Sequence, residues 1–310
     1  MGDKLRVSVV IAVDETGTQL EAAVRSALAV DVRELEVLVV DNSPDDRSTA
    51  ALRDVVDERV VRVRLRPGRG PLRPRNVGIA RARAPYVALL DPDNLLKPDR
   101  LSDALRALDN HTEAGFAFSD FAVVEERGNT VRPSGIGTSV DFGTVASEPL
   151  GDGWRLIRQP DLARGLLHGN PVGMSGVVLR RRLFTEIGPF DESAACWADL
   201  DLWFRLGHYC AALYSSEVSH TRRDKPQSDA VRPRAATEEC IAVLRREKSR
   251  WSERAARRQL DRLIAEHLAS VANEEGRHRR RLRSTAMYAY AFATCPDRRW
   301  LSGMVHSLLS

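Results

Sequence analysis

The sequence predicts an α/β protein with a doubly wound, mostly parallel sheet flanked by helices, followed by a C-terminal helical extension. Three observations favour this class. Apolar strands alternate with helix-length segments over residues 1 to about 110, acidic residues follow several of these strands, and the chain after Pro233 is mainly helical. Strands separated by helices form parallel sheets, and ligands bind beyond the carboxyl ends of their strands.

The N-terminal half of the predicted domain covers residues 1–110. Apolar runs predict strands at 5–13, 35–40, 60–65 and 86–90. Leu20, Val24 and Leu28 recur at a spacing of four after the first strand, which is typical of one helix face. A second helix is expected from about Arg73 to Arg83, directly before the fourth strand.

Residues 111–228 are expected to complete this domain. The pattern predicts a strand or hairpin at 115–126, a long loop at 127–153, a turn and strand at 170–179, a short helix at 181–187 and a further helix at 197–206. A loop as long as 127–153 is usually functional. The extension is then residues 229–310, with Leu260, Leu263, Ile264, Leu268 and Val271 on one apolar helix face.

The composition is that of an ordinary globular protein, with 43% hydrophobic and 29% charged residues among 310. No apolar stretch approaches the roughly 18 residues of a membrane span, and the first residues lead into a strand rather than a signal sequence. We therefore expect a cytoplasmic location. The four cysteines are far apart and form no CxxC pair, so we expect packing thiols rather than zinc ligands or disulfides.

The formal charge of +4 is unevenly distributed. Residues 245–283 hold 13 Lys/Arg against 6 Asp/Glu, a local +7, which leaves −3 for the rest of the chain. This segment predicts solvated helix faces, on which acids such as Glu253, Asp261 and Glu266 pair with the bases, or a surface for anionic lipid or another polyanion. Nucleic acid is not expected, because no recognition motif or aromatic interleaving accompanies the arginines.

Two carboxylates one residue apart, Asp91 and Asp93, directly follow the apolar run at 86–90. Such a pair repels itself unless a cation or protons neutralise it. The hard ions Mg²⁺ and Mn²⁺ prefer oxygen ligands, usually completed by water and phosphate oxygens. The pair therefore predicts a divalent metal site with a nucleotide diphosphate as partner. The alternative is a plain acidic turn, because Asp-Pro-Asp-Asn is also good loop chemistry.

Two common nucleotide-binding motifs are missing from the sequence. The first strand is followed by Val13-Asp14-Glu15-Thr16-Gly17 rather than by a glycine fingerprint, and there is no GxxxxGK[ST] loop. These absences argue against a dinucleotide-dependent dehydrogenase and against a P-loop NTPase.

From about Val7 to His220 the chain resembles the family 2 glycosyltransferases of the GT-A fold. VSVVIAVDE resembles the family's first strand and donor loop, and LEVLVVDNSPDDRS its second strand and acidic turn. PRNVGIARARAPYVALLDPDNLLKPDRL resembles the segment with the DxD motif. SGVVLRRRLFTEIGPFDES, followed by ADLDLWFRL, resembles the acceptor-side segment with the catalytic base.

The resemblance implies roles for single residues. The nucleotide base and ribose pocket would be lined by Ala12, Asp14, Asp41 and Asn42, with Arg75 nearby. Asp91 and Asp93 would bind Mn²⁺ or Mg²⁺ at the diphosphate, Asp93 more directly, and His220 would meet the metal or the diphosphate. Asp199 would be the general base. Arg222, Arg223 and Lys225 follow His220 and would offset charge on the leaving group.

Other interpretations stay open for several of these residues. Asp199 could be a first-turn acid favoured by the helix dipole, and His220 an ordinary hydrogen-bonded histidine. Trp197 could stack on an acceptor sugar or pack in the core. Ala12-Val13-Asp14-Glu15 replaces the Pro-Thr-Tyr-Asn type of segment usual in the family, so the nucleotide stays open among UDP, dTDP and GDP.

The function expected from the resemblance is an inverting, metal-dependent transfer of a sugar from a nucleotide-diphosphate sugar to a hydroxyl acceptor, in polysaccharide or related biosynthesis. A sugar-phosphate nucleotidyltransferase is an alternative, but it would need a glycine-rich, basic loop after the first strand. A noncatalytic GT-A-like binding protein is another. The basic C-terminal helices could place the protein against the inner face of an anionic membrane, cover the acceptor site or form a homodimer.

Overall fold

A computed structural model describes residues 4–13, 19–45, 47–68, 72–125, 128–136, 145–194, 196–224, 234–278 and 280–309. Asp14 and Lys225, both assigned roles above, lie outside these ranges. The chain divides into two compact units. The first comprises Met1–Glu192 and Leu202–Pro226, and the second Ser193–Asp201 and Gln227–Ser310. The second unit is therefore discontinuous in sequence.

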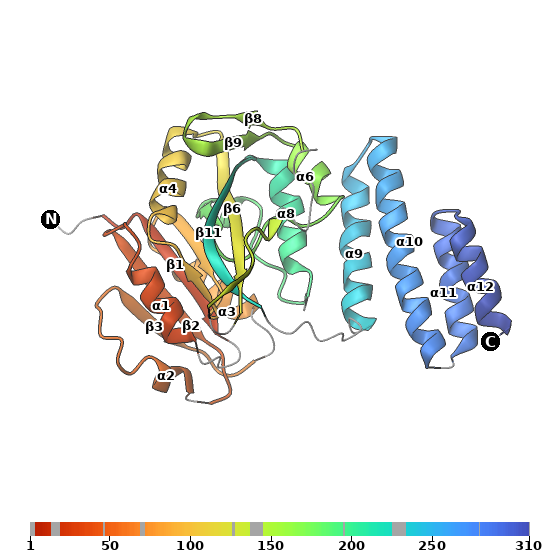
Figure 1. The fold of residues 1–310 in the computed structure, drawn as a ribbon, viewed down its shortest axis with the longest axis horizontal. Coiled ribbons are helices and arrows are strands. Elements are labelled where there is room, and N and C mark those ends of the chain that lie inside the picture. The colour runs from red at the N-terminus through yellow and green to blue at the C-terminus, as the bar shows by residue number, and fades with distance from the viewer. Residues whose placement is uncertain are drawn as a thin grey trace. The chain divides into compact units, whose positions relative to one another are not determined.

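The first unit is built around one mixed sheet with the strand order β3-β2-β1-β4-β10-β6-β11-β9-β8 (Figure 1). Its first four strands in the chain are β1 (Val7–Val13), β2 (Leu35–Asp41), β3 (Val60–Arg64) and β4 (Tyr86–Leu90). They are neighbours in the sheet and pair in parallel. Every residue of β1, β2 and β4 is buried, which explains their continuous apolar runs.

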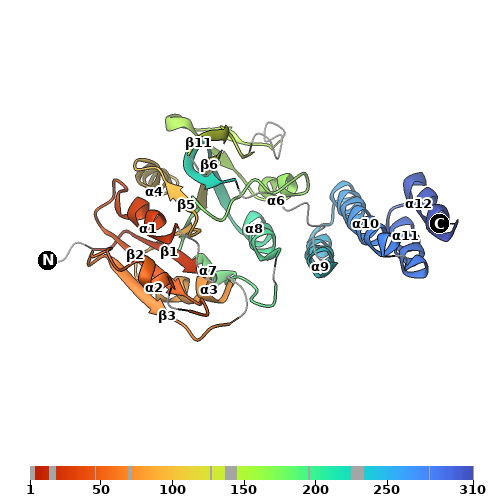
Figure 2. The same cartoon turned by 60° about the horizontal axis from the view of Figure 1, so that its bottom comes forward.

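Helices cover both faces of this parallel part of the sheet. On one face, α1 (Leu20–Leu28) and α4 (Arg100–Asn110) pack their apolar residues into a core with alternate residues of β1. On the other face lies α3 (Leu72–Arg81), as Figure 2 shows. It approaches so closely that a Cβ at Gly78 would lie 2.4 Å from Val10 Cγ1, so this position requires glycine. A short helix, α2 (Arg47–Ala51), connects β2 to β3.

The remaining strands extend the sheet. They are β5 (Asn94–Leu96), β6 (Ala114–Val124), β7 (Thr130–Arg132), β8 (Glu148–Pro149), β9 (Trp154–Ile157), β10 (Val178–Arg180) and β11 (Ala211–Arg223). β10 is antiparallel to both β4 and β6, whereas β6 and β11 pair in parallel. The predicted doubly wound, mostly parallel sheet flanked by helices is confirmed. The thirteen-residue strand β11 was not predicted, because Ser216, Glu217 and other polar residues interrupt its apolar pattern.

Four further elements belong to the connections of this unit: η2 (Gly151–Gly153), α6 (Asp161–Leu166), α7 (Leu183–Glu186) and α8 (Ala198–Tyr209). The boundary between the two units falls inside α8, after Asp201. The first turn of this helix thus belongs to the second unit.

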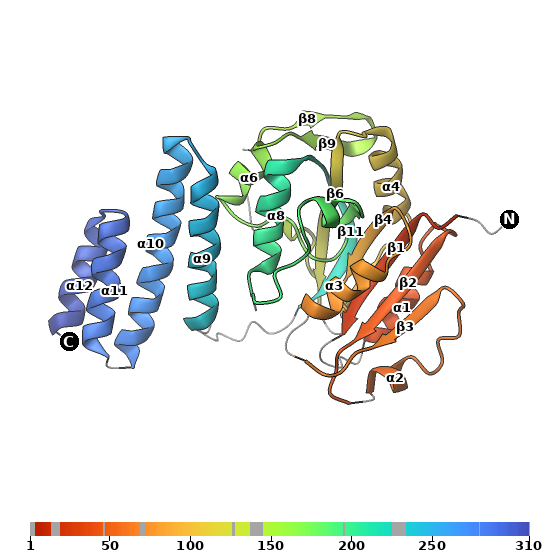
Figure 3. The same cartoon turned by 180° about the vertical axis from the view of Figure 1, so that it is seen from behind.

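The rest of the second unit consists of α9 (Arg234–Arg250), α10 (Arg254–Arg277), α11 (Arg281–Thr294) and α12 (Arg298–Leu309). These helices pack in sequence order, as Figures 1 and 3 both show, and the predicted C-terminal helices are confirmed. Basic residues pair with the expected acids, Lys248 with Asp261 and Arg262 with Glu266. Among the described residues, no helix combines the length and apolarity that a membrane crossing requires.

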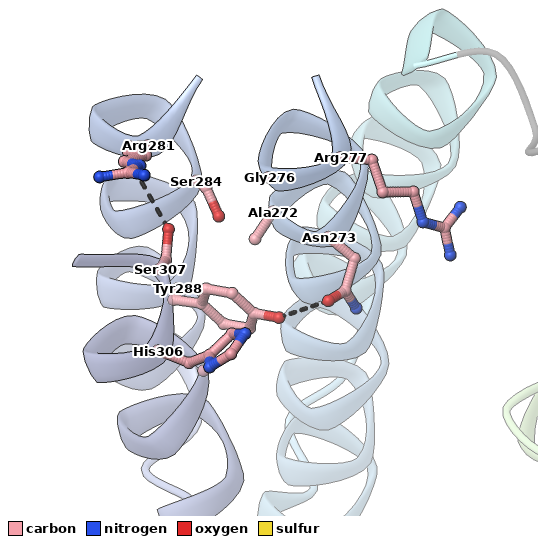
Figure 4. A pocket seen from close by; sticks show the side chains of 10 residues that line it. Ala272, Asn273, Gly276, Arg277, Arg281, Ser284, Tyr288, His306 and Ser307 are labelled. Atoms are coloured by element: carbon pink, nitrogen blue, oxygen red, sulfur yellow. Dashed lines mark hydrogen bonds between the residues drawn. The ribbon is translucent and has the colours of Figure 1, made fainter. Parts of the chain in front are cut away.

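A pocket of about 640 Å³ lies among α10, α11 and α12 (Figure 4). Tyr288 Oη donates a 2.6 Å hydrogen bond to Asn273 Oδ1, and Ser307 Oγ donates to the carbonyl of Arg281 at 3.3 Å. None of the described residues that line the pocket is an acid or a cysteine. The described lining therefore offers no carboxylate for proton transfer or for a metal.

Candidate active site

The carboxylates of Asp91 and Asp93 lie in a turn between β4 and β5. The N–H of Asn94 donates to the carbonyl of Asp91 at 3.1 Å and closes this turn. Pro92 has no N–H with which to extend the ladder of β4. The buried strand therefore ends by placing two partly exposed carboxylates at the carboxyl edge of the parallel sheet, which is where ligands of such sheets bind.

Ser175 anchors the turn from the segment before β10. Its Oγ accepts hydrogen bonds from the N–H of Asp91 at 2.9 Å and from Nδ2 of Asn94 at 2.7 Å. Ser175 is buried, so one hydroxyl fixes the turn from its buried side. We did not predict this residue, because residues 170–179 indicate a turn and a strand and a single serine in such a segment has no recognisable pattern.

Arg75 and Asp91, both predicted to be site residues, are brought together. Nη2 of Arg75 lies 2.6 Å from Oδ1 of Asp91, and the two side chains are 14% and 26% exposed. At this depth the ion pair is less screened than a surface pair. Arg75 therefore compensates one of the two carboxylate charges and fixes the position of Asp91.

A second cation approaches the turn from β11. β5 pairs with this strand so that Arg222 is opposite Asn94, and the Arg222 guanidinium lies 4.8 Å from the centre of the Phe121 ring. Burial is the main cause that lowers the pKa of Arg222, whereas the charges of Asp93 and Asp91 act to raise it. Arg222 thus lies within electrostatic reach of both carboxylates, and its action on a diphosphate stays a prediction.

His220 is buried two residues before Arg222, with only 2% of its surface exposed. Its ring stacks on Phe121, and Ser219 Oγ lies 2.9 Å from its Nδ1. Burial lowers the pKa of His220 to about 3, with Arg222 adding to the effect. Gly176 makes this close packing possible: its φ is +74°, and a Cβ there would lie 2.5 Å from His220 Nδ1.

The donor set for a divalent ion is partial. Asp91 and Asp93 supply the oxygen ligands that Mg²⁺ and Mn²⁺ prefer. Within the described ranges, however, no three His, Cys, Asp or Glu side chains are grouped so that they could hold a metal ion. His220 therefore does not complete a ready-made site with the two carboxylates, and its role as a ligand stays a prediction. The carboxylates fit an ion whose remaining ligands are water and phosphate oxygens.

Ala12, Asp41 and Asn42 lie together at the ends of β1 and β2, where Ala12 is paired with Val40. The carboxylate of Asp41 accepts hydrogen bonds from Ser43 and Ser48 and forms an ion pair with Arg64. Burial acts to raise the pKa of Asp41, but these bonds outweigh it and hold the pKa below its usual value. Asp41 thus stabilises this loop in the structure, and its contact with a nucleotide stays a prediction.

Asn42 presents an acceptor that the described residues leave unused. Its side chain is buried, and Nδ2 donates to the carbonyl of Gly68 at 3.0 Å. Oδ1 is buried as well and has no hydrogen-bond partner within the described part of the chain. Because an unsatisfied buried acceptor is costly, Oδ1 needs a donor that the described residues do not supply.

Asp199, the predicted base, lies in the first turn of α8 and belongs to the second unit. It is partly exposed. Trp197, the predicted acceptor contact, is also partly exposed, and its ring meets the His267 ring edge-on at 6.1 Å. The N–H groups of Cys196 and Trp197 both donate to Glu239 on α9. We did not predict a role for Glu239, because it is one acid among many on charged helices.

Comparison with known proteins gives a consistent assignment. A family model described as "Glycosyl transferase family 2" matches residues 8–188. The succinoglycan biosynthesis protein ExoO of Rhizobium meliloti (strain 1021) is 34% identical over 126 residues, which cover 41% of this chain and 36% of that protein. An uncharacterized glycosyltransferase, RC0461 of Rickettsia conorii, is 25% identical over 207 residues, or 64% of this chain and 31% of that protein. The matches span about a third of these relatives.

Solved structures show the same fold. S. aureus TarS 1–349 in complex with UDP-GlcNAc superposes with a TM-score of 0.64 at 17% identity, and the match covers 98% of this chain and 89% of that chain. A second structure of S. aureus TarS gives a TM-score of 0.62 at 16% identity, and the match covers 95% of this chain and 50% of that one.

Proposed function

This chain belongs to glycosyl transferase family 2, and we propose that it is a glycosyltransferase that transfers a sugar from a nucleoside diphosphate sugar to a hydroxyl acceptor. The proposal includes inversion at the anomeric carbon, Asp199 as general base and a requirement for Mn²⁺ or Mg²⁺. The main observation in its support is the anchored turn with Asp91 and Asp93 at the carboxyl edge of the sheet, between Arg75 and Arg222.

The donor side is assigned to the first unit. Arg75 and Arg222 bring positive charge to the turn, where a leaving diphosphate would build negative charge. A divalent ion held by Asp91 and Asp93 would add Lewis-acid stabilisation of the same charge. Ser175 keeps both carboxylates in place through the turn backbone.

Oδ1 of Asn42 is enclosed in the free protein, and a nucleotide that displaces its surroundings would satisfy it best with a ring N–H of the base. Uracil, thymine and guanine each have one, whereas the corresponding ring nitrogen of cytosine is an acceptor, so UDP, dTDP and GDP fit better than CDP. The fold neighbour TarS has been solved with UDP-GlcNAc and with UDP. Together these observations support a uridine diphosphate sugar as the first donor to test.

Asp199 would act on the acceptor. As the acceptor oxygen attacks the anomeric carbon from the face opposite the diphosphate, the carboxylate takes the hydroxyl proton. Trp197, two residues earlier and partly exposed, would pack against an acceptor sugar ring. The name of the first relative, a succinoglycan biosynthesis protein, supports a growing polysaccharide as acceptor.

We also propose that the second unit contacts anionic lipid. Residues 245–283 have a local charge of +7, and α11 and α12 expose large apolar side chains, including Leu282, Leu301, Val305 and Leu308. Exposed apolar groups among basic residues are typical of interfacial helices. The protein should float with anionic vesicles at low salt and not with neutral ones. Absence of flotation, or a dimer of the free protein that covers these residues, would contradict this contact.

Thermal unfolding with UDP, dTDP, GDP and CDP, each with and without Mn²⁺, tests the donor site. A nucleotide at about 100 times its dissociation constant should stabilise the fold by about 2.7 kcal/mol. We expect the largest shift with UDP and Mn²⁺, and its loss in Asp93→Ala. No shift with any nucleotide would favour a noncatalytic binding protein.

A product assay tests the reaction itself. A glycosyltransferase releases a nucleoside diphosphate together with the glycosylated acceptor, whereas a sugar-phosphate nucleotidyltransferase releases pyrophosphate. Detection of pyrophosphate without transfer to any acceptor would refute the proposal.

A further inference from the structure

The residues at the start of α8, the helix with Asp199, lack the side chains that usually cap a helix N-terminus. The carbonyl of Trp197 accepts the N–H of Asp201 at 3.1 Å, so Trp197 occupies the N-cap position of α8. Tryptophan has no side-chain acceptor for the N–H groups of a first turn. Leu200 stands three residues later, where a glutamate would reach back to the N-cap N–H in a capping box.

Glu239 on α9, 42 residues further along the chain, supplies the carboxylate that binds the N–H of the N-cap residue Trp197. Its Oε1 accepts the N–H of Trp197 at 2.6 Å and the N–H of Cys196 at 3.0 Å, and Oε2 lies 3.2 Å from the nitrogen of Cys196. Hydrogen bonds from N–H groups to an ionised carboxylate are stronger than neutral ones. The negative charge also suits the positive end of the α8 dipole.

Further contacts within the second unit hold the same segment. Nη2 of Arg246 on α9 lies 3.4 Å from Oδ1 of Asp201, whose side chain is only 9% exposed. His267 on α10 packs edge-on against Trp197 and lies 3.4 Å from the sulfur of Cys240. The chain is thus held two residues before Asp199, at Trp197, and two residues after it, at Asp201.

We propose that Glu239 is a positioning residue for the sugar transfer, which makes α9 a working part of the active site. This inference rests on the proposed function, in which Asp199 is the general base. Asp199 lies two residues after an N–H that Glu239 binds, so loss of the carboxylate would loosen the N-terminal end of α8 on which Asp199 lies. A catalytic group displaced by about 1 Å can cost roughly 100-fold in rate.

The test compares Glu239→Ala and Glu239→Gln with the neighbouring Glu238→Gln in the full chain. Glu238 is an exposed residue of the same helix and forms an ion pair with Arg234 at 2.7 Å, so Glu238→Gln controls for the loss of one α9 carboxylate. We expect Glu239→Ala to lower kcat roughly 10- to 100-fold with little change in KM for the nucleotide sugar. Glu239→Gln should retain more activity, because its amide oxygen still accepts a hydrogen bond. Glu238→Gln should match the wild type.

The exposed thiol of Cys196 gives a second readout that needs no turnover. Its alkylation, followed by peptide mass spectrometry, should accelerate in Glu239→Ala and stay unchanged in Glu238→Gln. If Glu239→Ala does not fold, Glu239→Gln takes its place: a smaller loss of kcat together with faster alkylation of Cys196 would then support the positioning role. Wild-type kcat in the folded Glu239 variants, or an equal loss in Glu238→Gln, would overturn the inference.

Asp199→Asn separates this inference from the function it rests on. If Asp199→Asn keeps the wild-type rate, the base assignment is wrong whatever Glu239 does. If Asp199→Asn is inactive while Glu239→Ala is fully active, only the positioning role of Glu239 is wrong.

Discussion

The two sets of candidate catalytic carboxylates are held in different ways. Asp91 and Asp93 end a fully buried strand, and their turn is fixed by Ser175 and Arg75 of the same compact unit. Asp199 lies on a helix whose N-terminal end is bound by side chains of α9. The candidate donor side is therefore a property of the sheet, whereas the proposed base, Asp199, depends on contacts within the second unit.

This difference predicts that donor binding and turnover can be separated by mutation. Damage near the turn should reduce nucleotide binding, and damage near α9 should reduce turnover while nucleotide binding persists.

The largest expected effect is that of Asp199→Asn. Removal of a general base typically costs about 10²- to 10⁴-fold in rate, and we expect a loss of kcat in this range. Nucleotide-dependent thermal stabilisation should stay at the wild-type value, because it reports on the first unit. A steady-state assay together with thermal unfolding checks both points. Loss of nucleotide binding in this variant would break the proposed separation.

Gly176→Ala is expected to destabilise the first unit, next to the turn with Asp91 and Asp93. Its φ of +74° disfavours a side chain, and the new Cβ would meet His220 and Ser219 at 2.5 and 2.6 Å. Strain alone costs about 1–3 kcal/mol, and the clash should add to it. Urea unfolding measures the loss.

Gly128→Ala is the matched control, since Gly128 has a φ of +86° and no atom of the described residues lies within 4 Å of its Cβ position. It should show the backbone strain without the clash. Equal destabilisation of the two variants would mean that close packing on His220 has no energetic consequence.

A smaller effect is expected for Asp41→Asn, and it should depend on pH. Hydrogen bonds from Ser43, Ser48 and Arg64 outweigh burial and hold the pKa of Asp41 below its usual value. A carboxyl with a lowered folded pKa stabilises the native state above its unfolded pKa of about 3.9, and this contribution disappears as the pH falls through the folded pKa. The substitution should therefore cost about 1–3 kcal/mol near pH 7 and progressively less in acid. Urea unfolding of both proteins from pH 7 to pH 3 checks the trend, and a constant difference would contradict it.

Much of the donor side could be predicted from the sequence because its determinants are local. Continuous apolar runs marked the buried parallel strands, and the adjacent acids of the turn marked their carboxyl edge. Strand β11 escaped prediction because Ser216 and Glu217 are exposed, which breaks the apolar pattern on which strand prediction relies.

The supports of the site were harder to predict because they act over long sequence separations. Ser175 binds Asp91 across 84 residues, and Glu239 binds Trp197 across 42. Neither residue belongs to a periodic or spaced pattern, and in each case a backbone N–H is one of the donors. Only the folded chain shows that such a side chain has a particular N–H group to bind.

The discontinuous second unit also bears on how this chain can exchange parts with its relatives. A chimera joined once, after residue 228, would combine the segment Ser193–Asp201 of one parent with the helices α9 and α10 of another. Residue 239 of one parent would then have to bind backbone N–H groups of the other parent. Exchange of the intact unit needs three junctions, two around Ser193–Asp201 and one before Gln227. We therefore expect the C-terminal helices to be inherited together with the segment that contains Asp199, the proposed base, rather than exchanged as a simple tail.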